Sequence, residues 1–193
     1  MNEQYEKKEL RQHIYDTPDT YVGGIDKINE VLPVKDDNKI VFKEIGYIPA
    51  LLNIFNEILV NARDQIVRLQ GISDNAKIIQ VTNIKINFNE DNSITILNDG
   101  NGITVKKHEK EKIYNPQLIF GELLTSSNYK KGEKRIVGGK NGYGAKLANI
   151  FSETFTVETV DHINKLKYTQ TWEKNMTVCN EPIINKCQGK PYT

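Results

Sequence analysis

The sequence predicts an α+β fold in which helices cover one face of a mixed, mostly antiparallel sheet. One observation is the run at residues 47–69, where apolar residues recur at steps of three and four and so indicate an amphipathic helix. Another is two pairs of alternating segments, 78–88 with 93–97 and 155–160 with 166–172, each typical of an antiparallel hairpin. Because the order mixes helices with hairpins instead of repeating strand–helix–strand, a two-layer α/β sandwich is favoured over a parallel sheet.

The N-terminal part is expected to contain a short helix, a loop and a hairpin. Residues 5–15 carry alternating charge and suit a short helix, whereas residues 16–24 are rich in turn formers. Two apolar stretches within residues 25–46 flank a polar turn, which indicates a hairpin or two edge strands. The long helix should then begin near Pro49 and stop at Gly71.

Two further helices and a long irregular stretch are expected later in the chain. Residues 114–124 form one helix candidate, with Pro116 near its start, and residues 145–151 form another. Residues 125–144 lie between them and are polar and rich in glycine. Irregular stretches of this length in a compact domain are usually functional, so we interpret this one as a mobile lid.

Composition sets limits on the class of protein. Hydrophobic residues make up 38% and charged residues 26% of the 193, as in a soluble globular domain. A net charge of +1 excludes the overall basic field of a dedicated nucleic-acid binder. Cys179 and Cys187 lack a metal-ligand pattern, which favours a reduced, intracellular setting. No apolar run approaches the length of a membrane span, so we expect no membrane partner.

The long helix carries a polar stripe that could do chemistry. Glu57, Asn61 and Asp64 stand at i, i+4 and i+7, so their side chains share one face. A carboxylate there can orient and deprotonate a water, and an amide can offer a neutral oxygen to a hard cation. From these residues alone, a stripe that simply faces solvent is the alternative.

The glycine-rich stretch does not fit the two commonest nucleotide motifs. No run matches the P-loop, and Leu147 occupies the position where a dinucleotide fingerprint needs its last glycine. What remains is Gly139, Gly142 and Gly144 leading into a helix that carries Lys146. Backbone amides at such a start can bind phosphate, although a structural turn would explain the glycines equally well.

Three separated stretches nevertheless agree with one another: the helix with Glu57 and Asn61, the corner at residues 98–102, and the glycine-rich start of a helix at residues 142–146. This order resembles the Bergerat-fold (GHKL) ATPases, the superfamily of gyrase B, Hsp90, histidine kinases and MutL. A closer resemblance, to eukaryotic-type DNA topoisomerases II, covers nearly the whole chain. The segments that carry it are IYNPQLIFGELLTSSNY at 113–129, GGKNGYGAK at 138–146, FTVET at 155–159, QTW at 170–172 and PDTY at 18–21.

The resemblance implies an ATP-hydrolysing site that uses Mg²⁺. Glu57 would be the general base that activates water against the γ-phosphate, and Asn61 would hold the Mg²⁺. Asn98 would read adenine, and Asp64 would orient water or the adenine-side loop. Gln65 and Lys140 depart from the asparagine and arginine usual in relatives, which puts those two contacts in doubt. Tyr5 would touch the nucleotide of a partner subunit. The implied ATP-binding residues are Asn61, Asp64, Asn98, Gly100, Gly102, Ile103, Ser126, Ser127, Asn128, Gly139, Lys140, Asn141, Gly142, Tyr143, Gly144, Ala145 and Lys146.

The resemblance also implies a domain organisation. Residues 1–193 would form the ATPase domain, with an N-terminal arm at 1–24 and an ATP lid at 125–144. The transducer and the DNA breakage-reunion region would be absent. We therefore expect these residues to bind nucleotide, hydrolyse it very slowly and dimerise weakly if at all.

In the complete enzyme, a type II DNA topoisomerase, ATP would close an N-terminal gate between two subunits and drive one DNA duplex through another. The expected location is intracellular: the nucleus for a eukaryotic source, or the host nucleus, viral factory or virion for a viral one.

Two other readings stay open. A chaperone or mismatch-repair ATPase of the same superfamily would lack the signatures at residues 125–129 and 170–172. A nucleotide-binding module without turnover would not need Glu57 and Asn61.

Overall fold

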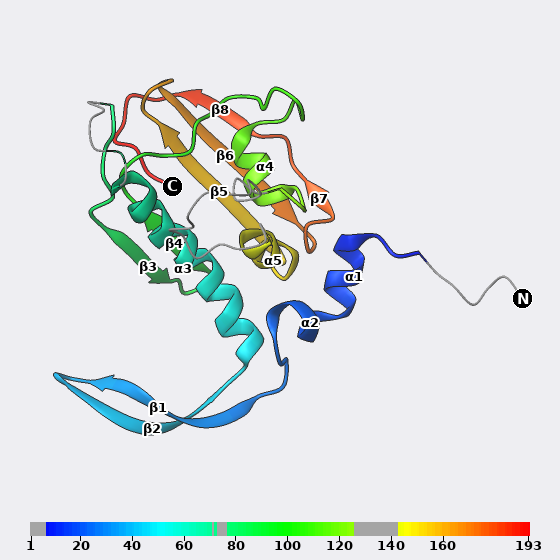
Figure 1. Cartoon of the computed structure of the whole chain (residues 1–193), viewed down its shortest axis with the longest axis vertical. Coiled ribbons are helices and arrows are strands. Elements are labelled where there is room, and N and C mark those ends of the chain that lie inside the picture. Colours follow the sequence, from blue (N-terminus) through cyan, green and yellow to red (C-terminus); the bar gives the residue numbers. More distant parts are fainter. Residues whose placement is uncertain (1–6, 71, 73–76, 126–142) are drawn as a thin grey trace, which may run out of the picture. The chain divides into compact units, whose positions relative to one another are not determined.

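The computed structural model describes residues 7–70, 72, 77–125 and 143–193. The chain forms two compact units, residues 1–56 and 57–193. Helix α3 (Pro49–Gln70) begins in the first unit and continues into the second, and Figure 1 shows the elements of both. The beginning of α3 at Pro49 agrees with the prediction, since proline needs no backbone N–H in the first helical turn.

The first unit contains two short helices and a hairpin. Helix α1 (Leu10–Asp16) overlaps the predicted helical segment, residues 5–15, and ends one residue beyond it. The prediction of a loop at residues 16–24 is wrong in part. Helix α2 (Pro18–Val22) forms there, with its proline in the first turn. Strands β1 (Ile28–Asp36) and β2 (Lys39–Tyr47) pair antiparallel, which confirms the predicted hairpin.

The first two strands of the second unit, β3 (Ile84–Phe88) and β4 (Ile94–Asn98), form an antiparallel hairpin. The prediction started this hairpin at residue 78, and that boundary is wrong. Residues 78–83 alternate like a strand, but they bond to the loop after β4: Asn101 N donates to Ile79 O at 2.9 Å, and Ile79 N donates to Asn101 Oδ1 at 2.7 Å. Main-chain and side-chain bonds to this loop therefore replace a strand ladder there.

A larger sheet is built around β5 (Thr154–Asp161) and β6 (Leu166–Glu173), the predicted hairpin. Two short strands that the sequence pattern did not reveal, β7 (Val178–Cys179) and β8 (Ile183–Lys186), also pair with β6. In the β5–β6 register Phe155 faces Trp172 and Thr159 faces Tyr168, so these four side chains share one face of the sheet.

Helices α4 (Asn115–Gly121) and α5 (Gly144–Ile150) cover that face (Figure 1). Aromatic rings join the two layers. The ring centroid of Phe120 lies 6.0 Å from that of Phe155, and the Phe155 centroid lies 6.2 Å from that of Trp172. Trp172 is 1% exposed and contributes a large share of the apolar area removed from water. The packing of small, buried α5 side chains such as Ala145 and Ala148 lets the helix approach the sheet closely.

The two sheets of this unit are joined by the last two residues, Tyr192 and Thr193. Asn98 N donates to Thr193 O at 2.9 Å, and Thr193 N donates back to Asn98 O at 3.0 Å. On the other side, Val160 N of β5 donates to Tyr192 O at 3.0 Å. Main-chain hydrogen bonds therefore run from β4 through this segment to β5, and the bridge between Asp99 and Tyr192 is antiparallel. The predicted α+β class, with mostly antiparallel strands and helices over a sheet, is confirmed.

Gly121 offers a test of this packing. A Cβ built on Gly121 would lie 2.8 Å from the Trp172 ring, and the buried ring has no room to move. Gly121→Ala should therefore lower the free energy of unfolding by about 1–3 kcal/mol. Denaturant unfolding measures the change. Gly24→Ala, whose Cβ would meet its nearest atom at 3.9 Å, is the matched control and should change it by less than about 0.5 kcal/mol. Equal stabilities for the two variants would contradict the packing.

Candidate active site

The side chain of Glu57, a residue of α3, lies against the start of α5. A Cβ built on Gly144, the first residue of that helix, would come within 2.0 Å of Glu57 Oε2. The structure therefore brings the predicted base on α3 against the predicted phosphate-binding helix, and it does so because residue 144 has no side chain. Glu57 is half-buried, and this burial raises the pKa of its carboxyl group. A carboxylate with a raised pKa is better suited to accept a proton near neutral pH.

Asn61 follows Glu57 by one helical turn. Its side-chain Nδ2 donates to the Glu57 backbone carbonyl at 2.7 Å. That bond fixes the amide plane and leaves Oδ1 without a hydrogen-bond partner among the described residues. A neutral oxygen held this way suits a hard cation such as Mg²⁺. The donor set thus fits the predicted metal role of Asn61.

Gln65 continues the stripe by one more turn, which the sequence argument did not foresee. Its Nε2 donates to Asn101 O at 3.1 Å and ties α3 to the loop after β4. The predicted third member, Asp64, is instead fully buried, with Arg63 Nη1 3.5 Å from its Oδ1. From Glu57 to Gln65 the stripe spans about 12 Å at 1.5 Å per residue. One end of it therefore meets α5 and the other meets the β4 corner.

The β4 corner is held in place by Asp99. Its carboxylate accepts hydrogen bonds from Thr82 N at 2.6 Å and Asn83 N at 2.8 Å, and from both side chains. Burial raises the pKa of Asp99, but these bonds lower it by more, so the pKa lies well below its usual range. Beside it, the predicted adenine reader Asn98 is 6% exposed and donates through Nδ2 to Asp99 O at 3.0 Å.

The loop after Asn98 rests directly on backbone. Gly100 has φ +83°, and a Cβ there would lie 2.7 Å from Val81 N. Gly102 would place a Cβ 2.2 Å from Val160 O of β5. Neither position can hold a larger residue without a shift. The next residue, Ile103, donates its N–H to Thr159 Oγ1 at 2.9 Å. The predicted residues Gly100, Gly102 and Ile103 therefore form one loop fixed to β5.

Lys146 lies in the first turn of α5 and is almost fully buried, at 4% exposed. Its Nζ donates to Thr125 O at 2.8 Å. Burial lowers the pKa of its ammonium to about 8, and the nearby Glu122 carboxylate opposes part of that shift. The predicted counter-charge is thus present at neutral pH and already engaged with Thr125, the first residue of the expected lid.

Of the other predicted residues on this helix, Ala145 is buried in it and Tyr143 precedes it as the N-cap. The remaining predicted positions lie outside the described residues. They are Tyr5, Ser126, Ser127, Asn128, Gly139, Lys140, Asn141 and Gly142.

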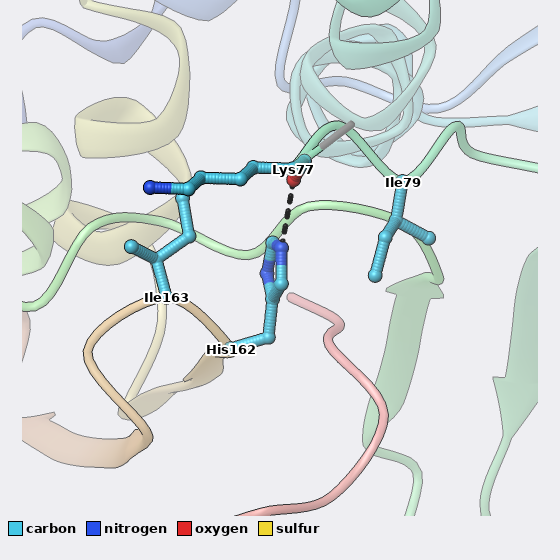
Figure 2. Close-up of a pocket in the computed structure, with 4 residues that line it drawn as sticks. All are labelled: Lys77, Ile79, His162 and Ile163. Carbon is cyan, nitrogen blue, oxygen red and sulfur yellow. Dashed lines mark hydrogen bonds between the residues drawn. The ribbon is translucent and has the colours of Figure 1, made fainter. Parts of the chain in front are cut away.

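Two surface hollows lie in the described part of the chain. One holds about 330 Å³ and is lined by Lys77, Ile79, His162 and Ile163; Figure 2 shows the His162 ring against the Lys77 carbonyl, 2.9 Å away. The other holds about 390 Å³ beside α4 and includes Glu122 and Thr125. Neither contains Glu57, Asn61 or Asn98.

The described part of the chain contains no cluster of three or more His, Cys, Asp or Glu residues suited to a metal ion. In the same part, every helix is too short or too polar to span a membrane. Cys179 and Cys187 are both free thiols.

Sequence reasoning missed the residues that support the corner from below. Thr159 and Asp161 of β5 accept the backbone N–H groups of Ile103 and Val105, at 2.9 and 2.8 Å. A signal was present, since the register that buries Phe155 and Val157 turns polar at these two positions. Polar residues on the buried face of a strand need partners, and that requirement marks them.

Comparison with known proteins places these features in a family. The model described as histidine kinase-, DNA gyrase B-, and HSP90-like ATPase matches residues 68–192, well over half of the chain. The chain therefore belongs to this family of ATPases. The position of Glu57 and Asn61 on α3, with a glycine at the start of α5, agrees with the class.

Within the family, the similarity is to type II DNA topoisomerases. The chain is 48% identical over 195 residues to DNA topoisomerase 2 of Candida glabrata, an alignment that covers all of this chain and 13% of that protein. It is 45% identical over 195 residues to the Plasmodium falciparum protein, covering 100% and 14%, and 43% over 201 residues to that of Acanthamoeba polyphaga mimivirus, covering 100% and 15%. The chain thus spans about one seventh of the length of these relatives.

Solved structures give the same answer. The fold matches the ATPase region of Saccharomyces cerevisiae topoisomerase II with a TM-score of 0.91 and 40% identity, covering 100% of this chain and 49% of that one. It matches the ATPase and transducer domains of the Balamuthia mandrillaris enzyme with a TM-score of 0.89 and 42% identity, covering 99% and 48%. The expected resemblance to the ATPase region of eukaryotic-type topoisomerase II is confirmed.

The burial of Glu57 predicts a pH effect on stability. A carboxyl group whose pKa is raised by folding binds more protons in the folded chain, so stability is greatest in acid and falls as the pH rises from the ordinary carboxyl pKa through the raised one. Glu57→Gln removes this dependence. The variant should be more stable than wild type at pH 7, and the difference should vanish in acid. Denaturant unfolding across this pH range measures it, with the exposed Glu90→Gln as control. A Glu57→Gln variant less stable than wild type at pH 7 would contradict the burial.

Proposed function

We propose that residues 57–193 form the ATP site of a type II DNA topoisomerase. The observation that carries the proposal is the α3 stripe, in which Glu57 lies against the start of α5 and Gln65 is bonded to the β4 corner. A span of about 12 Å suits an extended nucleotide, with its triphosphate at Gly144 and its base at Asn98. The membership of the chain in a family of ATPases supports the same assignment.

Each group has a role that its surroundings support. The half-buried Glu57 carboxylate orients a water and takes its proton as that water attacks the γ-phosphate. Asn61 Oδ1 holds Mg²⁺, which neutralises charge on the phosphates when it is bound. The α5 amides and Lys146 face the triphosphate. Asn98 can donate and accept, so it can read the exocyclic amine of adenine.

The larger activity belongs to the longer protein. There, ATP binding closes a gate between two subunits and drives one DNA duplex through a break in another, with DNA bound by regions outside these residues. The similarity to DNA topoisomerase 2 along the whole chain supports this proposal. Nuclear residence follows for a eukaryotic source, and the host nucleus, viral factory or virion for a viral one.

A Glu57 substitution tests the assigned base. In a longer chain that includes the segment following this one in relatives, Glu57→Ala should lower the rate of ATP hydrolysis by roughly 10²–10⁴-fold. Binding of a non-hydrolysable ATP analogue with Mg²⁺ should persist, because the carboxylate acts on the water and not on the nucleotide. Steady-state turnover and calorimetric titration measure the two quantities. Unchanged turnover in Glu57→Ala would refute the role of this residue. Robust turnover by residues 1–193 alone would contradict the expectation that they hydrolyse ATP very slowly.

The lowered pKa of Lys146 predicts that nucleotide affinity depends on pH. With a pKa of about 8 in the empty site, its charged fraction falls from about nine-tenths at pH 7 to about one-tenth at pH 9. Affinity for the ATP analogue should therefore weaken as the pH rises across this range. Lys146→Arg keeps its charge and should lose this dependence. Titrations at several pH values test it, with the exposed Lys174→Arg as a control that retains the wild-type profile. A wild-type affinity that is flat between pH 7 and 9 would rule out Lys146 as the phosphate contact.

A further inference from the structure

Thr159 of β5 is buried beneath the corner that carries Asn98. Its side chain is on the helix-covered face of the sheet and has no exposed surface. A buried hydroxyl is costly unless its hydrogen-bonding capacity is used. The partners of this hydroxyl therefore decide why threonine is tolerated at a position that otherwise follows the apolar Phe155 and Val157.

Three partners fill that capacity. Thr159 Oγ1 donates its one hydrogen to Tyr192 O at 2.9 Å. It accepts from Ile103 N at 2.9 Å. The remaining neighbour, Thr193 Oγ1 at 2.7 Å, must then be the donor of that pair. One donor and two acceptor sites are all that a hydroxyl offers, so the group is saturated.

These partners are on the two sides of the proposed base site. Thr193 pairs with Asn98 through both of its main-chain groups, at 2.9 and 3.0 Å. Ile103 ends the loop that begins at Gly100, and Gly102 lies so close to β5 that a Cβ would be 2.7 Å from Thr159 Oγ1. A single hydroxyl thus bonds β5 both to the loop and to the segment that pairs with Asn98.

We propose that Thr159 is a positioning residue for base recognition: its hydroxyl, without touching nucleotide, fixes Asn98 and the Gly100–Ile103 loop so that adenine is bound in preference to guanine. The inference rests on the proposed function, because it needs Asn98 to face the base. The α5 side of the site, which would hold the triphosphate, shares none of the three bonds. Loss of the hydroxyl should therefore act on the choice of base.

The test compares ATP and GTP analogues, both non-hydrolysable, bound to the chain with Mg²⁺. Thr159→Val keeps the shape but leaves Ile103 N unpaired and removes one of the two hydrogen bonds that Tyr192 O accepts. It should lower the ratio of ATP to GTP affinity by about tenfold or more. Thr159→Ser keeps the hydroxyl and should retain the wild-type ratio. If the valine variant does not fold, Thr159→Ala takes its place and the same loss of ratio is expected.

Thr156→Val is the matched control. Thr156 is on the same strand, and its hydroxyl meets Thr171 Oγ1 at 2.9 Å on the exposed side. This variant should keep the wild-type ratio, since a merely structural threonine would change stability without changing base preference. A folded Thr159→Val or Thr159→Ala variant with the wild-type ratio would overturn this inference alone. Failure of the wild-type chain to bind either analogue would overturn the proposed function together with it.

Discussion

Hydrogen bonds from β5 to its neighbours join two otherwise separate sheets into one body in residues 57–193. Val160 N reaches Tyr192 O through the main chain, while Thr159 and Asp161 reach the loop after β4 through their side chains. The β3–β4 hairpin alone would be marginal, because two isolated strands bury too little surface in water. Its corner, with Asn98 and the glycines behind it, depends on β5 for its position. The proposed base end of the site is consequently supported by residues of β5 that have no proposed contact with the base.

The ionisable groups of the site experience three different environments. Asp99 is surrounded by donors and remains charged, so it acts as a fixed support for the 82–83 segment. Glu57 has lost part of its hydration, which raises the pKa of its carboxyl group and so increases its affinity for a proton. Lys146 is more deeply buried and is compensated by a carbonyl oxygen and by Glu122. Only the last two lie where reacting phosphates are proposed.

The sequence was a good guide wherever structure follows from local periodicity. The long helix, both expected hairpins of the second unit and the stripe of Glu57 and Asn61 were predicted because each follows from a repeat of two or of 3.6 residues. The failures lie in segments where no local repeat identifies the partner. Residues 78–83 look like a strand, yet their partners are Asp99 and Asn101, and β7 and β8 are too short to show a period.

Support that crosses long sequence distances was also hidden. The bond from Ile103 to Thr159 spans 56 positions, and that from Thr159 to Thr193 spans 34. No local pattern encodes which segments meet. The resemblance to known ATPases supplied the roles of Asn98 and Lys146, whereas the carbonyl on which Lys146 rests, and the bond from Gln65 to Asn101, became visible in the structure.

Trp172 is the single tryptophan of the chain, and it lies where β6 meets α4. Its indole is shielded from water, with Phe155 on one side and Gly121 on another. Emission from this ring will shift to longer wavelength when solvent reaches that layer and will stay constant while it is intact. The fluorescence of Trp172 therefore reports on the packing of the helix-covered sheet. It does not report on residues 1–56, which contain tyrosine but no tryptophan.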